Sequence, residues 1–322
     1  MRAAIYREPG DSSVLSVEEV PTPSPGPGAV RVRVACSGVN PTDWKMRRGM
    51  GGSAPDAAQV PHQDGAGVID AVGEGVDEGR MGQRVWLLMA AHRNRWGTAA
   101  EYSVVPGERA VPLPDAAPDE LGASLGVPAV TAAHCLGGNP GALAGTTVLV
   151  AGGAGAVGHY AVELAKRAGA SVVATASSEE KAELSRRAGA DAVVDYRALD
   201  AADQVRAVAP HVDRIVEVAL GANLELDLAV SRPGTHIVTY ANEASDPVLP
   251  TRRLMAANVT LGYVLLYGVP DPALAAAVSW VEEAVAGGAL SLLPLHRYPL
   301  DEVAAAQDAV EAHAVGKVLL VL

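Results

Sequence analysis

The chain has 322 residues, of which 49% are apolar, and its formal net charge is −12. This length and composition can bury one large core or two ordinary cores, so we expect two domains. The acidic balance argues against a nucleic-acid-binding surface, which needs clustered Lys and Arg. The expected partners are therefore small molecules or a second copy of the chain.

Membrane association is not expected either. No window holds the roughly 18 uncharged apolar residues that a membrane span needs, and the N-terminal MRAAIYREPG lacks the apolar core of a signal peptide. The sequence therefore predicts a cytoplasmic protein. The cysteines are Cys36 and Cys135, too few for a disulfide framework or a four-cysteine zinc lobe. We expect them to be buried thiols without chemistry.

Short β-branched runs separated by Pro and Gly dominate the first third of the chain. They cover residues 30–39, 66–76 and 83–89. Runs of this length between turn residues predict a largely antiparallel β domain.

From about Ser124 the pattern changes to apolar strand runs that alternate with helical patterns of ten or more residues. The strand runs cover residues 148–152, 171–176, 191–196, 213–219 and 235–240. This alternation predicts a doubly wound parallel sheet with helices on both faces. The tail adds a helix at 272–288, a short strand within 290–299, a helix at 301–314 and a strand at 317–322. We expect this tail to return to the first domain.

A glycine cluster lies between the first of these strands and a helical pattern. Gly153, Gly155 and Gly158 satisfy G-x-G-x-x-G in a strand–turn–helix context, which is typical of dinucleotide binding. The helix N-terminus would bind the pyrophosphate. The residues expected at the cofactor are Ala154, Gly155, Ala156, Val157 and Gly158.

The tip of the second strand lacks the carboxylate that binds the ribose hydroxyls of NAD. Ala176 leaves space there, Ser177 and Ser178 can donate hydrogen bonds, and Lys181 brings a positive charge. The segment therefore favours NADPH. The alternative for Lys181 is an exposed helix residue. Tyr196 could flank the adenosine phosphate or simply face solvent from its loop.

These segments resemble the medium-chain dehydrogenase/reductase superfamily and, within it, the quinone oxidoreductases related to zeta-crystallin. The similar segments are CSGVNPTDWKMRRG (36–49), HQDGAGVIDAVGEGV (62–76), GTAAEYSVVP (97–106), the glycine cluster and GKVLLVL (316–322). The resemblance implies a mainly antiparallel GroES-like catalytic domain at 1–123 and 266–322. It also implies a Rossmann NADPH-binding domain at 124–265, and a homodimer formed through an edge strand of that domain.

The resemblance also bears on metal. Zinc alcohol dehydrogenases of the superfamily carry ligands where Asn40, Gln63 and Val127 stand here. Asn, Gln and Val do not supply the thiolate, imidazole or carboxylate donors of a zinc site. His62 is one residue out of register, and we interpret it as an ordinary loop histidine. No metal ligand is therefore predicted.

Without zinc an alcohol is hard to activate, whereas a quinone or an activated alkene is already electrophilic. The resemblance thus implies direct hydride transfer from NADPH to a quinone in a cleft between the domains. The alternative is an alkenal or enoyl-thioester reductase, whose substrate would need a basic rim such as Arg47, Arg48, Arg93 and Arg95, unless these are merely solvated. A non-catalytic NADPH-binding protein is the third possibility.

Individual site residues follow from the same resemblance. Asn40, Asp43 and Gln63 are the expected catalytic residues, although Asn40 could cap a turn before Pro41 and Asp43 could start a helix. Trp44 is expected at the substrate or in the core. Many relatives have a tyrosine at the position of Gly51, the other residue expected at the substrate. The further residues expected at the cofactor are Asn40, Thr131, Ala219, Tyr240, Ala241, Tyr263, Val264 and Lys317. Thr131 could instead bond its own helix, and Lys317 could cap a turn.

Overall fold

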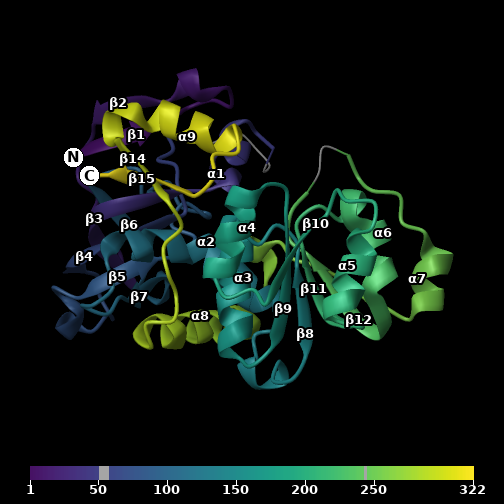
Figure 1. Cartoon of the computed structure of the whole chain (residues 1–322). Helices are drawn as coiled ribbons and strands as arrows, with labels where there is room; N and C mark the ends of the chain where they lie inside the picture. The colour runs from purple at the N-terminus through teal and green to yellow at the C-terminus, as the bar shows by residue number, and fades with distance from the viewer. Residues whose placement is uncertain (51–57, 243–244) are drawn as a thin grey trace. The chain divides into compact units, whose positions relative to one another are not determined.

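The computed structural model describes residues 1–50, 58–242 and 245–322 of the chain. It divides into two compact units, one formed by Met1–Val127 with Leu292–Leu322 and the other by Pro128–Ser291 (Figure 1). Among the described residues, no helix is long and apolar enough to cross a membrane.

The first unit is a mainly antiparallel β structure, as the sequence predicts. Its large sheet has the order β14-β15-β3-β4-β5-β7, and β6 also pairs with β3. A separate antiparallel pair joins β1 to β2. The strands are β1 (Arg2–Ile5), β2 (Ser16–Glu19), β3 (Ala29–Val39), β4 (Asp64–Val72), β5 (Arg84–Leu87), β6 (Tyr102–Pro106), β7 (Ala110–Pro112), β14 (Leu295–Pro299) and β15 (Lys317–Val321). The helices are α1 (Pro41–Arg47) and α9 (Val303–Glu311), while α2 (Asp119–Cys135) passes from the first unit into the second.

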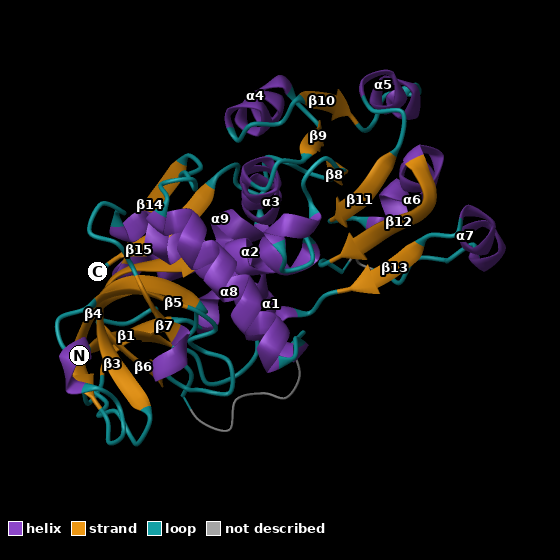
Figure 2. Ribbon diagram, turned by 90° about the horizontal axis from the view of Figure 1, so that it is seen from below, coloured by secondary structure: helices purple, strands orange, loops and turns teal. Residues whose placement is uncertain are grey.

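The second unit is a parallel sheet in the order β10-β9-β8-β11-β12-β13, with helices on both faces (Figure 2). This confirms the predicted doubly wound fold, whose strand order reverses direction between β8 and β11. The strands are β8 (Thr147–Val150), β9 (Ser171–Ala176), β10 (Ala192–Asp195), β11 (Val212–Glu217), β12 (Ser231–Thr239) and β13 (Thr260–Tyr263). The helices are α3 (Ala156–Arg167), α4 (Glu179–Arg187), α5 (Ala201–Val208), α6 (Leu220–Val230), α7 (Thr251–Ala257) and α8 (Asp271–Ala286).

The core of this unit follows from strand burial on both faces. Leu149, Val173, Ile215 and Ile237 from neighbouring strands are each at most 3% exposed and belong to one apolar cluster. Because both faces are covered by helices, the strands read as continuous apolar runs rather than alternating ones.

The boundary of the second unit differs from the sequence expectation. Residues 266–291, which we assigned to the GroES-like domain, lie in the second unit. Helix α8 buries Trp280 and Val281 there, and Ser291 after it donates its hydroxyl to Glu163 of α3 at 2.5 Å. The return to the first unit therefore begins at Leu292.

Candidate functional site

The carboxyl ends of the parallel strands bring most of the predicted cofactor residues to one edge of the second unit. Strand register aligns Val150 with Val216, and Glu217 with Thr239. The turns that follow these strands therefore lie along the same edge, which is where ligands bind in open α/β sheets. The predicted residues at this edge are Ala154, Gly155, Ala156, Val157, Gly158, Ser177, Ser178, Tyr196, Ala219, Tyr240, Ala241, Tyr263 and Val264.

The three glycines of the turn after β8 have different surroundings. A Cβ on Gly153 would lie 2.8 Å from Ala174 Cβ, and one on Gly158 would lie 2.2 Å from the backbone oxygen of Gly152. A Cβ on Gly155 would meet only that oxygen, at 3.3 Å. Gly153 and Gly158 are therefore needed for packing, whereas Gly155, the N-cap of α3, leaves open space at the helix N-terminus.

The tip of the second strand has the arrangement that a phosphate needs. Ser178 N-caps α4 by accepting a hydrogen bond from Lys181 N, and Lys181 Nζ donates to Ser177 Oγ at 3.4 Å. The ammonium group and a serine hydroxyl thus lie together beyond Ala176 at the end of β9. The carboxylates of Glu179 and Glu180 also lie in the first turn of α4, where the helix dipole favours them.

A second cation at this tip was missed from the sequence. Arg197 follows β10 directly after Tyr196, and its Nη2 donates to the backbone oxygen of Ser177. Its guanidinium also pairs with Asp195 at 2.9 Å. Tyr196 itself is 40% exposed. The sequence signal for Arg197 was its place beside Tyr196, since β10 lies next to β9 and parallel to it.

The buried carboxyl group of Glu217 stabilises the turn that follows β11. Glu217 Oε1 accepts hydrogen bonds from Ala219 N and from Asn223 Nδ2, the latter at 2.9 Å. Glu217 also hydrogen bonds to Asp227, and burial raises the pKa of both groups. A hydrogen bond between two carboxyl groups requires a proton on one of them. Thr131, on α2 in the same unit, is 5% exposed.

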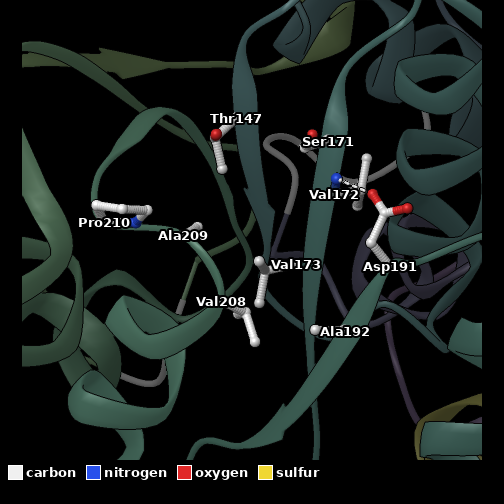
Figure 3. A pocket seen from close by; sticks show the side chains of 9 residues that line it. All are labelled: Thr147, Ser171, Val172, Val173, Asp191, Ala192, Val208, Ala209 and Pro210. Atoms are coloured by element: carbon white, nitrogen blue, oxygen red, sulfur yellow. Dashed lines mark hydrogen bonds between the residues drawn. The ribbon is translucent and has the colours of Figure 1, made fainter.

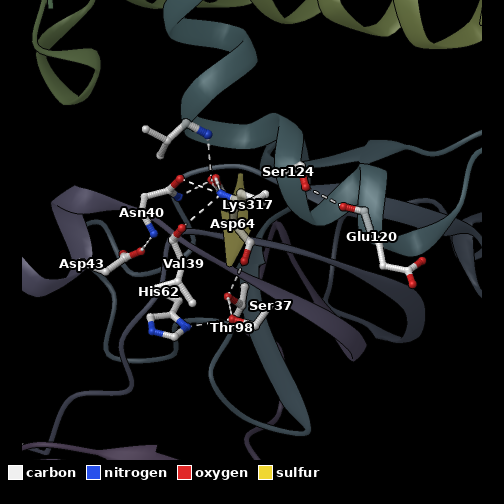
Figure 4. Close-up of polar contacts among 11 residues, drawn as sticks. Ser37, Val39, Asn40, Asp43, His62, Asp64, Thr98, Glu120, Ser124 and Lys317 are labelled. Carbon is white, nitrogen blue, oxygen red and sulfur yellow. Dashed lines mark hydrogen bonds and ion pairs between the residues drawn. The ribbon is translucent and has the colours of Figure 1, made fainter. Parts of the chain in front are cut away.

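In the first unit, three strand ends bring Asn40, Asp64 and Lys317 together (Figure 4). Val39 ends β3, and pairs with Val318 of β15, so Lys317 lies beside Asn40. Gly38 of β3 pairs with Asp64 at the start of β4. Lys317 Nζ donates to Asn40 Oδ1 at 2.7 Å, and Asn40 Nδ2 donates to Asp64 Oδ2 at 2.6 Å.

Backbone groups complete this cluster. Val127 N donates to Asp64 Oδ1 at 2.7 Å, and Lys317 Nζ also donates to Val39 O at 3.3 Å. Burial raises the pKa of Asp64 to about 6, although Lys317 opposes the shift. Burial likewise lowers the pKa of Lys317. Because a pKa of about 6 is below neutral pH, the carboxyl group of Asp64 is ionised at pH 7. Asp64 was missed as a site residue because its partners Val127 and Lys317 are distant in the sequence.

The other residues expected to be catalytic have structural partners. Asp43 Oδ2 accepts a hydrogen bond from Asn40 N at 2.7 Å and so starts α1, and burial raises the pKa of this carboxyl group. Gln63 Oε1 accepts from Ala91 N at 3.1 Å. Trp44 is half-buried, with Lys45 Nζ 5.7 Å from its ring centroid. Gly51 lies outside the described residues.

His62 lies in the loop before β4, as the sequence suggested, but it is fully buried with φ 76°. Gln307 Nε2 donates to its Nε2 at 3.1 Å, which leaves Nδ1–H to donate to Ser37 Oγ at 3.0 Å. Arg47 Nε in turn donates to Gln307 at 2.6 Å. Burial lowers the pKa of His62 to about 3, so the ring is neutral.

This chain of hydrogen bonds also changes the interpretation of the arginine cluster. Arg47 is 0% exposed and engaged with Gln307 and with the backbone oxygen of Gly10. It therefore does not contribute to a solvent-facing basic rim of the kind that a thioester carrier would need.

Two further observations concern metal and thiols. In residues 1–50, 58–242 and 245–322, no cluster of three His, Cys, Asp or Glu side chains could hold a metal ion.

Cys36 and Cys135 are free and buried, and burial raises the pKa of the Cys36 thiol to about 11. A thiol with this pKa is a poor nucleophile at neutral pH.

A pocket in the second unit lies at the opposite edge of the sheet from the glycine turn (Figure 3). Thr147 and Ser171, which begin β8 and β9, are among its lining residues. The charged group there, Asp191, accepts hydrogen bonds from Val172 N and Lys166 Nζ, both at 2.7 Å. Because Asp191 is already paired and the lining is otherwise largely apolar, we assign this pocket no role in the chemistry.

Each of the two units contains a segment that matches a known protein family. Residues 26–115 match the alcohol dehydrogenase GroES-like domain, and residues 156–283 match the zinc-binding dehydrogenase domain. The chain is 29% identical to the quinone oxidoreductase of Rattus norvegicus over 100% of this chain and 98% of that protein.

Two of the solved structures that match the whole chain bear on the cofactor. A mycobacterial protein in complex with NADPH is 30% identical, with a TM-score of 0.85 and full coverage of both chains. An NAD-dependent alcohol dehydrogenase is 26% identical, with a TM-score of 0.88 and full coverage of both chains.

Proposed function

The chain belongs to the medium-chain dehydrogenase/reductase superfamily and to its zeta-crystallin-like quinone oxidoreductases, and on this premise we propose that it reduces quinones with NADPH. The chain is thus an oxidoreductase. One observation carries the choice of cofactor: the tip of β9 presents Lys181, Ser177 and Arg197 without a carboxylate at position 176.

The residues present fit a dinucleotide. Open space at Gly155 lets a pyrophosphate approach the N-terminus of α3, where backbone N–H groups and the helix dipole favour an anion. The ammonium group of Lys181 and the hydroxyl of Ser177 suit a 2′-phosphate, because charge-assisted hydrogen bonds to phosphate are strong. One structure with the same fold is named an NAD-dependent alcohol dehydrogenase. The fold alone therefore does not determine whether NADH or NADPH binds, and we assign this choice to the side chains at the tip of β9.

NADPH supplies the hydride when it is bound. The chain's own contribution is to bind, to orient and to stabilise charge. A quinone accepts a hydride without prior activation, and negative charge then develops on its oxygen. The carboxamide of Asn40, whose Oδ1 contacts the Lys317 ammonium group, is the donor that we assign to this charge. The further roles of Gln63 and Trp44 at the quinone stay predictions.

Turnover with a panel of acceptors tests this function. The purified protein should oxidise NADPH with 1,4-benzoquinone and 9,10-phenanthrenequinone, and more slowly with 2-alkenals and crotonyl-thioesters. Faster turnover of the alkenals or thioesters would replace the quinone reductase by an alkene reductase. Tight NADPH binding without turnover of any acceptor would indicate a binding protein.

We also propose a homodimer through β13, the edge strand of the parallel sheet. Tyr263 at the end of β13 is 65% exposed, and the neighbouring Leu265 is 70% exposed. An edge strand with exposed apolar side chains can pair with a second copy. Light scattering that gives the mass of one chain would contradict the dimer. The cytoplasmic location stays a prediction of the sequence.

A further inference from the structure

The carboxamide of Asn40 is held in one orientation by two groups of opposite hydrogen-bonding character. The ammonium group of Lys317 can only donate, and it contacts Oδ1 at 2.7 Å. The carboxylate of Asp64 can only accept, and it contacts Nδ2 at 2.6 Å. Rotating the amide by 180° would set donor against donor and acceptor against acceptor. The flipped orientation is therefore excluded by both partners at once.

The burial of all three side chains makes this arrangement more than a surface ion pair. Asn40 is 2% exposed, Asp64 is 0% exposed and Lys317 is 3% exposed. A buried charge is stable only with a close partner and further hydrogen bonds. Val127 N and Val39 O supply these additional bonds, while the Lys317 and Asp64 charges lie 3.9 Å apart. The Asn40 amide hydrogen bonds to both charged groups, so all three side chains form one buried cluster.

We propose that Lys317 and Asp64 are positioning residues that orient the Asn40 carboxamide, and that Lys317 also strengthens its second Nδ2 hydrogen as a donor to the oxygen of the hydride acceptor. This inference rests on the function proposed above. An amide nitrogen carries two hydrogens, and Asp64 accepts one of them. The proposal assigns the other hydrogen to the charge that develops on the reduced acceptor.

The physical basis is polarisation of the amide. A cation at the carbonyl oxygen draws electron density from the nitrogen, so hydrogen bonds along the chain strengthen one another. The positive charge also lies one amide away from the developing negative charge, in a region from which water is excluded. The Asp64 carboxylate stabilises the buried Lys317 ammonium group, and it fixes the orientation of the Asn40 amide. Lys317 was expected to contact the cofactor, and it is instead assigned a role through Asn40.

The test is a double-mutant cycle between Lys317→Met and Asn40→Ala in the full-length protein. The rate constant of NADPH oxidation is measured in single turnover with 1,4-benzoquinone, and the NADPH dissociation constant by fluorescence titration. Both single variants should slow the reaction, Asn40→Ala by about 100- to 1000-fold, the usual effect of a lost oxyanion donor. The NADPH dissociation constant of Lys317→Met should change by less than about 2-fold, since the lysine acts on the acceptor side.

The double variant decides whether Lys317 acts through Asn40. If it does, Lys317→Met has no further effect once Asn40 is alanine, so the double variant is as slow as Asn40→Ala alone. The proposal would be overturned if Lys317→Met slowed the reaction equally in the wild type and in Asn40→Ala. Lys317 would then have a structural role or act independently of Asn40. An unchanged rate for either single variant would overturn it too.

Two additional variants keep the result interpretable. Lys166→Met removes another Lys–Asp pair, at Asp191 on the opposite edge of the second unit's sheet, and should leave the rate unchanged. If Lys317→Met fails to fold, because Asp64 is left as a buried lone charge, Lys317→Met with Asp64→Asn removes both charges together. This neutral pair should restore the melting temperature and still react slowly; a wild-type rate would overturn the proposal.

Failure of the proposed function is a separate result. In that case the wild type binds NADPH and turns over no quinone, and the inference about Lys317 falls with it. If the wild type does reduce quinones, the cycle alone decides on Lys317.

Discussion

Cofactor choice at the tip of β9 depends on a few side chains, of which Ser177 and Lys181 are half-buried. Lys181→Ala removes one charge-assisted hydrogen bond from the proposed phosphate site. Such a bond is worth roughly 1.5–3 kcal/mol when desolvated and less in water. We expect the dissociation constant for NADPH to rise about 10-fold, since about 1.4 kcal/mol is a factor of ten. The constant for NADH should hardly change.

The measurement is kcat/KM for both cofactors at fixed ionic strength, because exposed phosphate contacts are screened by salt. Arg187→Ala, at the far end of the same helix α4, is the matched control. Ala176→Asp should shift the preference toward NADH, since its carboxylate repels a phosphate and accepts from ribose hydroxyls. Equal weakening of both cofactors by Lys181→Ala would contradict the phosphate site.

The buried chain through His62 determines stability rather than chemistry. Gln307→Leu leaves Arg47 Nε and His62 Nε2 without their partner, both inside the first unit. Each buried unsatisfied group costs about 1–3 kcal/mol, so we expect a loss of about 2–5 kcal/mol in the free energy of unfolding. Urea denaturation measures this loss.

The control is Gln204→Leu, which removes a hydrogen bond between the exposed side chains of Gln204 in α5 and Asp200, the N-cap of that helix. A change below about 0.5 kcal/mol is expected there. If Gln307→Leu were equally mild, water would have to replace the lost amide, and His62 would not depend on this chain.

At the scale of residues, the sequence predicts which side chains lie at the site better than it predicts their hydrogen-bond partners. Ser177 and Lys181 were identified because a missing carboxylate at the second strand is a local signal. His62, Gln307 and Arg47 are far apart in the chain, so no spacing reveals that they share hydrogen bonds. Asp64 was overlooked for the same reason, since its partners come from β15 and α2.

At the scale of elements, the strand–turn–helix unit β8-α3 separates a binding glycine from packing glycines. Gly155→Val should abolish dinucleotide binding and leave the fold, because its side chain would occupy the space of the pyrophosphate. Gly158→Val should unfold the unit or destabilise it strongly, because its Cβ would lie 2.2 Å from the oxygen of Gly152.

Circular dichroism and NADPH titration of the two variants check this contrast. A Gly155→Val protein that is folded and binds NADPH with unchanged affinity would make the glycine cluster only a structural turn. A Gly158→Val protein with wild-type stability would contradict the packing role.

The elements themselves were predicted well where local signals are strong. The alternation of apolar runs with helical patterns revealed β8 to β12 and the helices between them, because each strand is buried on both faces. We expected α8 in the first unit, and it lies in the second. Its contacts to the second unit depend on Ser291 and Glu163, which are 128 residues apart, and no local pattern encodes such a contact.

At the scale of the whole molecule, an acidic chain with a net charge of −12 still buries several carboxyl groups. Burial raises the pKa of Glu163 to about 7 and raises that of Asp227 well above its ordinary value. It lowers the pKa of His159 to about 4. His159 and Glu163 are neighbours on α3, so between pH 4.5 and 6.5 the proton that His159 loses on folding is offset by the one that Glu163 gains.

Above pH 7 this compensation ends, and two sets of carboxyl groups with raised pKa values remain: Asp43, whose pKa is about 8, and the pair of Glu217 and Asp227. A raised pKa means that the folded chain keeps a proton that the unfolded chain has released. The stability from this pair is therefore complete below the ordinary pKa of a carboxyl group and is lost as the pH rises toward the folded value. While one extra proton is bound, the slope is about 1.4 kcal/mol per pH unit.

We therefore expect the free energy of unfolding to fall as the pH rises above 7, as measured by urea denaturation from pH 7 to pH 9 at fixed ionic strength. Asp227→Asn keeps a hydrogen-bond donor toward Glu217 and removes the shared proton, so the fall should become clearly shallower. Asp115→Asn, at an exposed turn, should keep the wild-type slope. A wild type whose stability is constant from pH 7 to pH 9 would mean that both carboxylates are ionised in the folded state. The loop from Glu217 to Ala219 would then be stabilised by Asn223 and the backbone alone.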